Sequence, residues 1–269
     1  MVQSKYEVLL EQRIEIAHLF DSNNFLDRNA DVAPTTCSPK RHLMFLNGHQ
    51  TGGATVQDML LRYVDRRNLT LATPPKGMLT FFDQFPFSAK FVRGYKSEKY
   101  YDVITHQLRF SKEVKKVLKH NDTFYFSILR NPVTLMTSSY SSFKQDFPAF
   151  KLSESLEDFL SNPSIYHNPY LKENVHVKNP IWSDFGFDNI ATCSEEQYTK
   201  ALVEIEELFP IILISEYFDE GMILLKEALC WDIDDVVTFT HDSRNKTDIT
   251  PIQYDLSSSS AGVLNPRAW

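Results

Sequence analysis

The segment Leu43-Met-Phe-Leu-Asn-Gly-His-Gln-Thr-Gly-Gly-Ala-Thr55, with the stretch that follows it, decides the fold of this 269-residue chain. Its apolar start predicts a short buried strand, and its glycines predict a turn. The apolar periodicity from Val56 to Arg67 then predicts an amphipathic helix. A helix that starts directly after such a turn offers backbone N–H groups and the positive end of its dipole. The segment therefore predicts an anion site.

The glycine spacing Gly48-x4-Gly53 is similar to that of the phosphate loop of nucleotide kinases and hydrolases. That loop carries a lysine directly before Ser or Thr, and the lysine meets the charge of the phosphates. Here Ala54 precedes Thr55, and Ala54 makes no charged contact. This difference disfavours a phosphate-loop kinase or hydrolase. A plain strand–turn–helix unit without a ligand is the simplest alternative for this segment.

The rest of the chain repeats the alternation of strand and helix. Further strands are predicted at 101–105, 123–129 and 211–215, and helices at 56–67, 111–120, 133–143, 195–209 and 219–229. This order predicts an α/β fold with a mostly parallel central sheet flanked by helices. Residues 145–190 are expected to be irregular apart from a helix near 156–160. We expect an N-terminal helix and linker over 1–40, and one domain over 41–269.

The composition narrows the class of protein. A net charge of −7 argues against a general nucleic-acid binder, although a local cationic cluster can still hold an anionic cofactor. No apolar run approaches the roughly 20 residues that span a bilayer. The three cysteines have no metal-site spacing and allow at most one disulfide. Three N-glycosylation sequons, beginning at Asn68, Asn121 and Asn245, weakly favour a secretory origin.

A second anion element follows the strand predicted at 123–129. The strand ends on Arg130, and Ser138 comes eight residues later on the next predicted helix. Two helical turns can bring a hydroxyl to the phosphate that a guanidinium grips. The alternative is an arginine in a structural salt bridge and a serine on a helix face. The combination of a glycine loop with an Arg-x7-Ser element looks like the two-part signature of sulfotransferases.

Longer motifs make the resemblance specific. The chain resembles the galactose-3-O-sulfotransferase family, which includes galactosylceramide sulfotransferase. The matching stretches follow the family's order: 45–55, Asp102-Val-Ile-Thr-His-Gln-Leu-Arg-Phe110, 128–140, Asp184-Phe-Gly-Phe-Asp-Asn189, 213–220 and 224–237. The resemblance covers roughly residues 42 to 269.

The resemblance implies a P-loop-like sulfotransferase fold and an enzyme that depends on 3′-phosphoadenylyl sulfate (PAPS). Such an enzyme transfers sulfate to the 3-hydroxyl of a terminal galactose on a glycolipid or glycoprotein. It needs no obligatory metal, and it works at the lumenal side of the Golgi membrane. The residues expected to bind the donor are Gly48, Thr51, Gly52, Gly53, Ala54, Thr55, Arg130 and Ser138. The loop is expected to hold the 5′-phosphosulfate, and Arg130 with Ser138 the 3′-phosphate.

The chain departs from the family in the donor loop. Relatives carry a Lys-Thr-His-Lys-Thr loop, whereas this chain has Asn47-Gly-His-Gln-Thr51, so both lysines are replaced. Gln50 offers one neutral hydrogen bond where a lysine would neutralise charge on the leaving phosphate. We expect donor binding with much reduced turnover, and the alternative is a homologue that binds nucleotide or glycan without transfer. We also expect the closing helix after Trp269 and the membrane anchor of the family to be missing here.

Candidate catalytic residues are His49, Gln50 and His106. His49 is the first choice for the base that takes the hydroxyl proton, because imidazole titrates near the working pH. His106 lies in a stretch similar to the family's acceptor-side His-x-x-Arg-Phe and is expected to bind or deprotonate the sugar. Arg109 of that motif and Glu216 are candidates for orienting these groups. Each of these side chains has a structural alternative, as an ion-pair partner or a satisfied buried histidine.

Overall fold

The computed structural model describes residues 37–239, apart from 119, 169, 172–173, 175 and 189–193. The chain divides into two compact units, Met1–Cys37 and Ser38–Trp269, and the fold below is that of the second. The helix predicted at 1–20, most of the linker and the tail after 239 lie outside the described residues.

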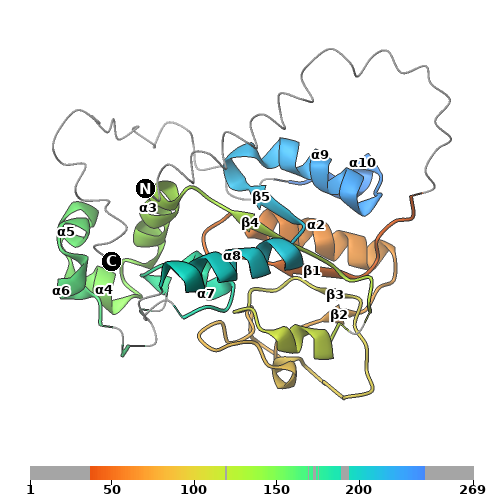
Figure 1. The fold of residues 1–269 in the computed structure, drawn as a ribbon, viewed down its shortest axis with the longest axis horizontal. Helices are drawn as coiled ribbons and strands as arrows, with labels where there is room; N and C mark the ends of the chain where they lie inside the picture. The colour runs from red at the N-terminus through yellow and green to blue at the C-terminus, as the bar shows by residue number, and fades with distance from the viewer. Residues whose placement is uncertain are drawn as a thin grey trace, which may run out of the picture. The chain divides into compact units, whose positions relative to one another are not determined.

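The centre of the second unit is a parallel sheet, as predicted. Its strands are β1 (Leu43–Leu46), β2 (Leu71–Ala72), β3 (Val103–Ile104), β4 (Phe124–Leu129) and β5 (Ile211–Ile214). They lie side by side in the order β2-β3-β1-β4-β5, and every neighbouring pair is parallel (Figure 1). β1 is central, with Leu43 opposite Val103 on one side and Phe124 on the other.

The longer helices follow the sequence prediction closely. They are α2 (Gly53–Arg66), α3 (Pro132–Phe143), α8 (Glu195–Leu208) and α9 (Phe218–Leu229). α2 starts three residues before the predicted start, because its first turn includes Gly53. Among the described residues, no helix is both long enough and apolar enough to cross a bilayer.

The short elements show two differences from the prediction. The helix expected at 111–120 is the 3₁₀ segment η2 (Lys112–Lys116), because its amides bond three residues back, as from Val114 to Ser111. Residues 145–190 are more helical than expected. They contain α4 (Pro148–Leu152), α5 (Leu156–Ser161), α6 (Pro163–Tyr166) and α7 (Pro180–Asp184). Three of these helices begin at a proline. Proline is favourable at the first helical position, because its missing N–H would have no partner within the helix there. The remaining short elements are η1 (Ala89–Phe91), η4 (Ser215–Tyr217) and α10 (Ile233–Val236).

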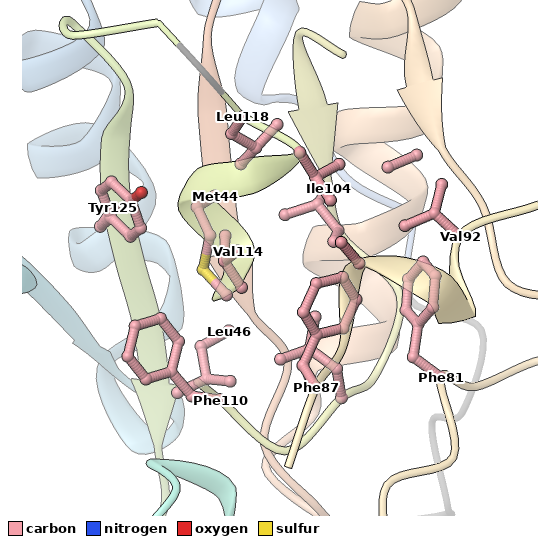
Figure 2. Close-up of a cluster of buried hydrophobic side chains, with 14 of the residues drawn as sticks. Met44, Leu46, Phe81, Phe87, Val92, Ile104, Phe110, Val114, Leu118 and Tyr125 are labelled. Carbon is pink, nitrogen blue, oxygen red and sulfur yellow. The ribbon is translucent and has the colours of Figure 1, made fainter. Parts of the chain in front are cut away.

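The strands bury both faces, so their side chains alternate between two hydrophobic clusters. Leu43 and Phe45 of β1 pack with α2, α9 and α10 on one face. Met44 and Leu46 point to the other face, where Phe81, Phe87 and Val114 fill the layer (Figure 2). All four β1 side chains are fully buried. This packing fixes the register of β1 and with it the position of the loop that follows.

Candidate functional site

The predicted site residues meet at the carboxyl edge of the sheet. The loop 47–52 follows β1, His106 follows β3, Arg130 follows β4 and Glu216 follows β5. Because these strands are parallel, their carboxyl ends face the same side. The chain leaves β1 toward β2 on one side, while β4 lies on the other. In open α/β sheets, ligands bind outside such a switch point.

Two left-handed residues shape the loop after β1. Gln50 has φ 57° and Gly52 has φ 82°, so the chain turns sharply before α2 begins at Gly53. The hydroxyl of Thr51 donates to the carbonyl of Gly48 at 2.9 Å and holds the turn closed. In the described structure no side chain caps α2 at Gly52. The start of α2 is therefore a helix N-terminus suited to an anion.

Asn47 and Gly53 are matched to one another. A Cβ on Gly53 would lie 2.0 Å from Oδ1 of Asn47, so the glycine leaves room for this side chain. Asn47 is buried and donates through Nδ2 to Oε1 of Gln57 at 3.1 Å. Asn47 is therefore part of the loop's internal packing.

Gln50 joins the two predicted anion elements. Nη1 of Arg130 donates to the backbone carbonyl of Gln50 at 3.0 Å, and Oγ of Ser138 donates to Oε1 of Gln50 at 2.8 Å. Nε of Arg130 donates to the hydroxyl of Thr134 at 3.2 Å. Among the described residues no carboxylate lies within ion-pair distance of Arg130. The Arg-x7-Ser element thus lies against the glycine loop and is not the structural salt bridge of the alternative.

His49 lies between two carboxylates. Its Nδ1 is 2.6 Å from Oδ1 of Asp184, and its Nε2 is 3.2 Å from Oδ2 of Asp83. The backbone N–H of His49 also donates to Oδ2 of Asp184, at 2.9 Å. The ring of His176 stacks on that of His49 with centroids 3.8 Å apart. His49, His176 and Asp184 are all at least nine-tenths buried.

The neighbouring carboxylates and the burial of the two rings set the charges of His49 and His176. Burial alone lowers the pKa of His49, but the charge and hydrogen bond of Asp184, with those of Asp83, outweigh it and raise the pKa to about 9. Burial and the charge of His49 lower the pKa of His176 to about 3. Near neutral pH, His49 is therefore an imidazolium and His176 is neutral. His49 must lose its proton before it can act as the predicted base.

Asp184 is placed by contacts that sequence reasoning did not anticipate. It ends α7, and its carbonyl accepts from the N–H of Phe110 at 2.8 Å. Gly186 allows this turn, because its φ is 94° and a Cβ there would lie 2.3 Å from the carbonyl oxygen of Phe110. The motif Asp184–Asn189 was singled out in the sequence without a role for its aspartate. Asp83 and His176 carried no sequence signal, since each lies in an irregular segment.

The acceptor-side candidates are near the same edge. His106 is partly buried, burial lowers its pKa, and its Nδ1 has no hydrogen-bond partner among the described residues. Arg109 donates to the carbonyl of Phe187 at 2.9 Å. Oε1 of Glu216 accepts from the N–H of Asn131 at 3.0 Å, which ties the end of β5 to that of β4. The roles of His106 and Glu216 stay predictions.

A metal is not required to explain the buried cluster. Donor atoms of His49, Asp83 and His176 lie within 4.8 Å of one another. Their contacts, however, are those of an imidazolium hydrogen-bonded to carboxylates and stacked on a neutral ring. We assign no metal to this group.

Comparisons with known proteins identify the family to which the chain is similar. The family model described as Galactose-3-O-sulfotransferase matches residues 14–269. Galactose-3-O-sulfotransferase 2 of Homo sapiens is 40% identical over 210 residues, which cover 77% of this chain and 52% of that protein. The Mus musculus protein of the same name is 38% identical over 218 residues, covering 79% and 55%. Galactosylceramide sulfotransferase of Homo sapiens is 30% identical over 223 residues, covering 82% and 52%.

The parallel sheet, with a glycine-rich loop between its central strand and α2, defines an open α/β fold, a class in which ligands bind at the switch point. Within that class, the chain belongs to the galactose-3-O-sulfotransferase family. It spans about half the length of the curated relatives it matches. A crystal structure of a sulfotransferase from Alicyclobacillus acidocaldarius matches 78% of this chain and 88% of its own with a TM-score of 0.40 and 15% identity. The fold assignment rests on the sheet itself.

Proposed function

We propose that this protein transfers a sulfuryl group from PAPS to the 3-hydroxyl of a terminal galactose on a glycolipid or glycoprotein. The observation that carries the proposal is the convergence of Arg130 and Ser138 on Gln50, the central residue of the loop after β1. This convergence supports one bipartite anion site rather than two unrelated features. Family membership then supports a sulfated donor.

In this proposal the start of α2, from Gly52 to Thr55, holds the 5′-phosphosulfate through backbone N–H groups. Arg130 and Ser138 hold the 3′-phosphate. On binding, each would give up its present hydrogen bond to an oxygen of Gln50 and donate to a phosphate oxygen instead. Arginine suits this contact because its planar guanidinium donates two parallel hydrogen bonds to a phosphate.

The reaction is an in-line displacement at sulfur. The galactose O3 forms the new S–O bond, the bond from sulfur to the 5′-phosphate oxygen breaks, and that oxygen keeps the electron pair. The hydroxyl proton passes to a base, for which His106 is the candidate, because burial lowers the pKa of His106 whereas His49 is already protonated near neutral pH. Positioning and charge stabilisation supply most of the catalysis in such transfers, so we propose a mechanism without a metal.

His49 is a cation within the loop itself, next to Gln50. Its imidazolium is held between Asp184 and Asp83 and supplies one positive charge in the loop. In the family's Lys-Thr-His-Lys-Thr loop, lysines stand both before and after the corresponding histidine. Gln50 itself donates no charge. We therefore propose that transfer is slow compared with a lysine-bearing loop, while donor binding persists.

A transfer assay tests the proposal. The protein is incubated with PAPS carrying labelled sulfate and with a β-galactose-terminated glycolipid or disaccharide. The expected product is a galactose sulfated at O3, and a matched acceptor with 3-O-methylgalactose is expected to accept no label. Binding of 3′-phosphoadenosine 5′-phosphate without any transfer would point to the alternative, a binding protein without catalysis. Absence of both binding and transfer would overturn the proposal.

We further propose that the protein works at the lumenal side of the Golgi membrane, as the family resemblance implies. Cys230 at the end of α9 is disulfide-bonded, which suits an oxidising lumen. Asn68 and Asn121, the first residues of two sequons, are exposed and open to glycosylation. A glycosidase-sensitive mass shift of the expressed protein, together with Golgi staining, is the expected result. Cytosolic staining without glycan would contradict it.

A further inference from the structure

The segment 81–87 contains Asp83, a contact of His49, together with four phenylalanines. Phe81 and Phe87 are 0% and 1% exposed and belong to the hydrophobic cluster on one face of the sheet (Figure 2). Phe82 and Phe85 are 37% and 43% exposed. Core packing therefore explains the first two side chains, but it does not explain why the other two lie at the surface next to the site.

Phe82 is held in an unusual backbone conformation. Its φ is 46°, in the left-handed region that a bulky residue rarely adopts. The N–H of Phe85 donates to the carbonyl of Phe82 at 2.8 Å, and the ring of Phe82 packs on that of Phe91 with centroids 5.0 Å apart. Backbone strain of this kind persists where the surrounding structure fixes it, and it is concentrated at functional sites. The turn thus holds the ring of Phe82 in place while leaving it partly exposed.

Asp83 joins this turn to the loop after β1. Its Oδ2 lies 3.2 Å from Nε2 of His49. Burial raises the pKa of Asp83, but the hydrogen bond and charge of His49 outweigh burial and lower it, so the carboxylate is ionised near neutral pH. The side chain of Asp83 is 20% exposed, against 9% for His49 and 3% for Asp184. Asp83 is therefore the member of this ion-paired group that a ligand reaches first.

The charge of Asp83 limits what can bind at this position. A carboxylate repels the phosphates of a nucleotide, so this position does not suit the donor. Carboxylate oxygens accept hydrogen bonds, and the hydroxyls of a hexose donate them. The C–H groups on one face of β-galactose are apolar and pack well on an aromatic ring. An exposed ring next to an ionised carboxylate therefore suits a sugar better than an anion or a plain hydrocarbon.

We propose that Asp83 and Phe82 bind the terminal galactose of the acceptor, Asp83 by accepting hydrogen bonds from sugar hydroxyls and Phe82 by packing on the apolar face of the sugar. The inference rests on the proposed function, because it names residues that hold the acceptor of that reaction. The contact of Asp83 with His49 places the sugar beside the loop after β1. The ring of His106, the candidate base, lies 6.0 Å from that of Phe81, which directly precedes Phe82.

Binding of lactose, which ends in β-galactose, to protein saturated with 3′-phosphoadenosine 5′-phosphate tests the proposal. Asp83→Asn keeps the shape of the side chain but loses its charge, and it should weaken lactose binding by about 5- to 10-fold. Phe82→Gly should weaken it by a similar factor, about 5- to 10-fold, through lost apolar contact. Glycine adopts φ 46° without strain, so this variant should keep a melting temperature close to that of the wild type. Binding of the nucleotide should be unchanged in both variants.

Matched controls come from the opposite edge of the sheet. Tyr100, shortly before β3, is an exposed aromatic residue, and Asp122, shortly before β4, is an exposed aspartate. Tyr100→Gly and Asp122→Asn should leave lactose binding unchanged. In the sulfate-transfer assay, Asp83→Asn and Phe82→Gly should raise the KM for the acceptor and leave the KM for PAPS unchanged.

The outcomes separate this inference from the proposed function. Lactose binding equal to that of the wild type in both site variants would overturn the inference, and sulfate transfer by the wild type would then leave the proposed function standing. Weakened lactose binding in both variants, without transfer by the wild type, would support a galactose site and contradict the proposed transfer. No lactose binding by a wild type that binds the nucleotide, or equal weakening of lactose and nucleotide in the variants, would also overturn the inference.

Discussion

The charge of His49 leads to a quantitative prediction about pH and stability. The pKa of His49 is raised from 6.5 to about 9 by Asp184 and Asp83 against the effect of burial. Since the folded-state pKa lies above the unfolded value, the contribution to stability is complete below pH 6.5. It is lost as the pH rises through about 9.

The size of the effect follows from the same two values. Each pKa unit corresponds to about 1.36 kcal/mol, so the span from 6.5 to about 9 is on the order of 3 kcal/mol. We expect the free energy of unfolding to fall by about that amount between pH 6.5 and 9.5. This is a large part of the stability of an ordinary domain.

Urea unfolding at a series of pH values measures the change, and His49→Gln is the matched control. Glutamine keeps a polar side chain of similar length but does not titrate, so the variant should be less stable at pH 7 and show a much smaller slope above pH 6.5. An NMR titration of the His49 ring should give the raised pKa directly. A wild-type stability that is flat from pH 7 to 9.5, or equal slopes in the two proteins, would refute the reasoning.

Three further predictions concern the same region. Gln50→Lys places a charge beside the leaving group and should raise the transfer rate by on the order of 10²–10³. The control Gln50→Met should not raise it. An unchanged rate in the lysine variant would mean that another cation already stabilises the leaving group. Gly186→Ala should lower the free energy of unfolding by at least about 1–3 kcal/mol, because alanine is strained at φ 94° and its Cβ would meet the Phe110 carbonyl; wild-type stability in chemical denaturation would contradict this. Because the pKa of His176 is lowered to about 3, its contribution to stability should decline as pH falls below 6.5. His176→Phe should remove that decline.

Elements with strong local signals were predictable from the sequence. β1, β4 and β5 are apolar runs bounded by turn residues, and α2, α3, α8 and α9 have helical periodicity, so their positions agree within a few residues. The parallel order followed from the alternation of these elements. By contrast, the short helices α4, α6 and α7 were not predicted, because segments of 4 or 5 residues are too short to show a helical periodicity.

The candidate site divides in the same way. The glycine loop and Arg130 each follow a strand of the parallel sheet, and Ser138 lies inside α3 about two turns after Arg130, so their approach at one sheet edge followed from topology. The partners of His49 did not, because Asp83, His176 and Asp184 are brought to it by contacts across long stretches of chain. Those contacts change the expected behaviour of His49 from a base near neutral pH to a cation. Such a reversal depends on burial and on charge neighbours, which no local pattern contains.

The central claim is that the loop after β1 and the Arg130–Ser138 element form one site for a nucleotide with a 3′-phosphate. Calorimetric binding of 3′-phosphoadenosine 5′-phosphate and of adenosine 5′-phosphate, to the wild type and to Arg130→Met, tests it most directly. Loss of a charged hydrogen bond costs about 1.5–3 kcal/mol. Arg130→Met should therefore weaken binding of the 3′-phosphorylated nucleotide by about 10- to 150-fold and leave adenosine 5′-phosphate nearly unaffected. Equal weakening of both nucleotides, or no binding of either by the wild type, would contradict the claim.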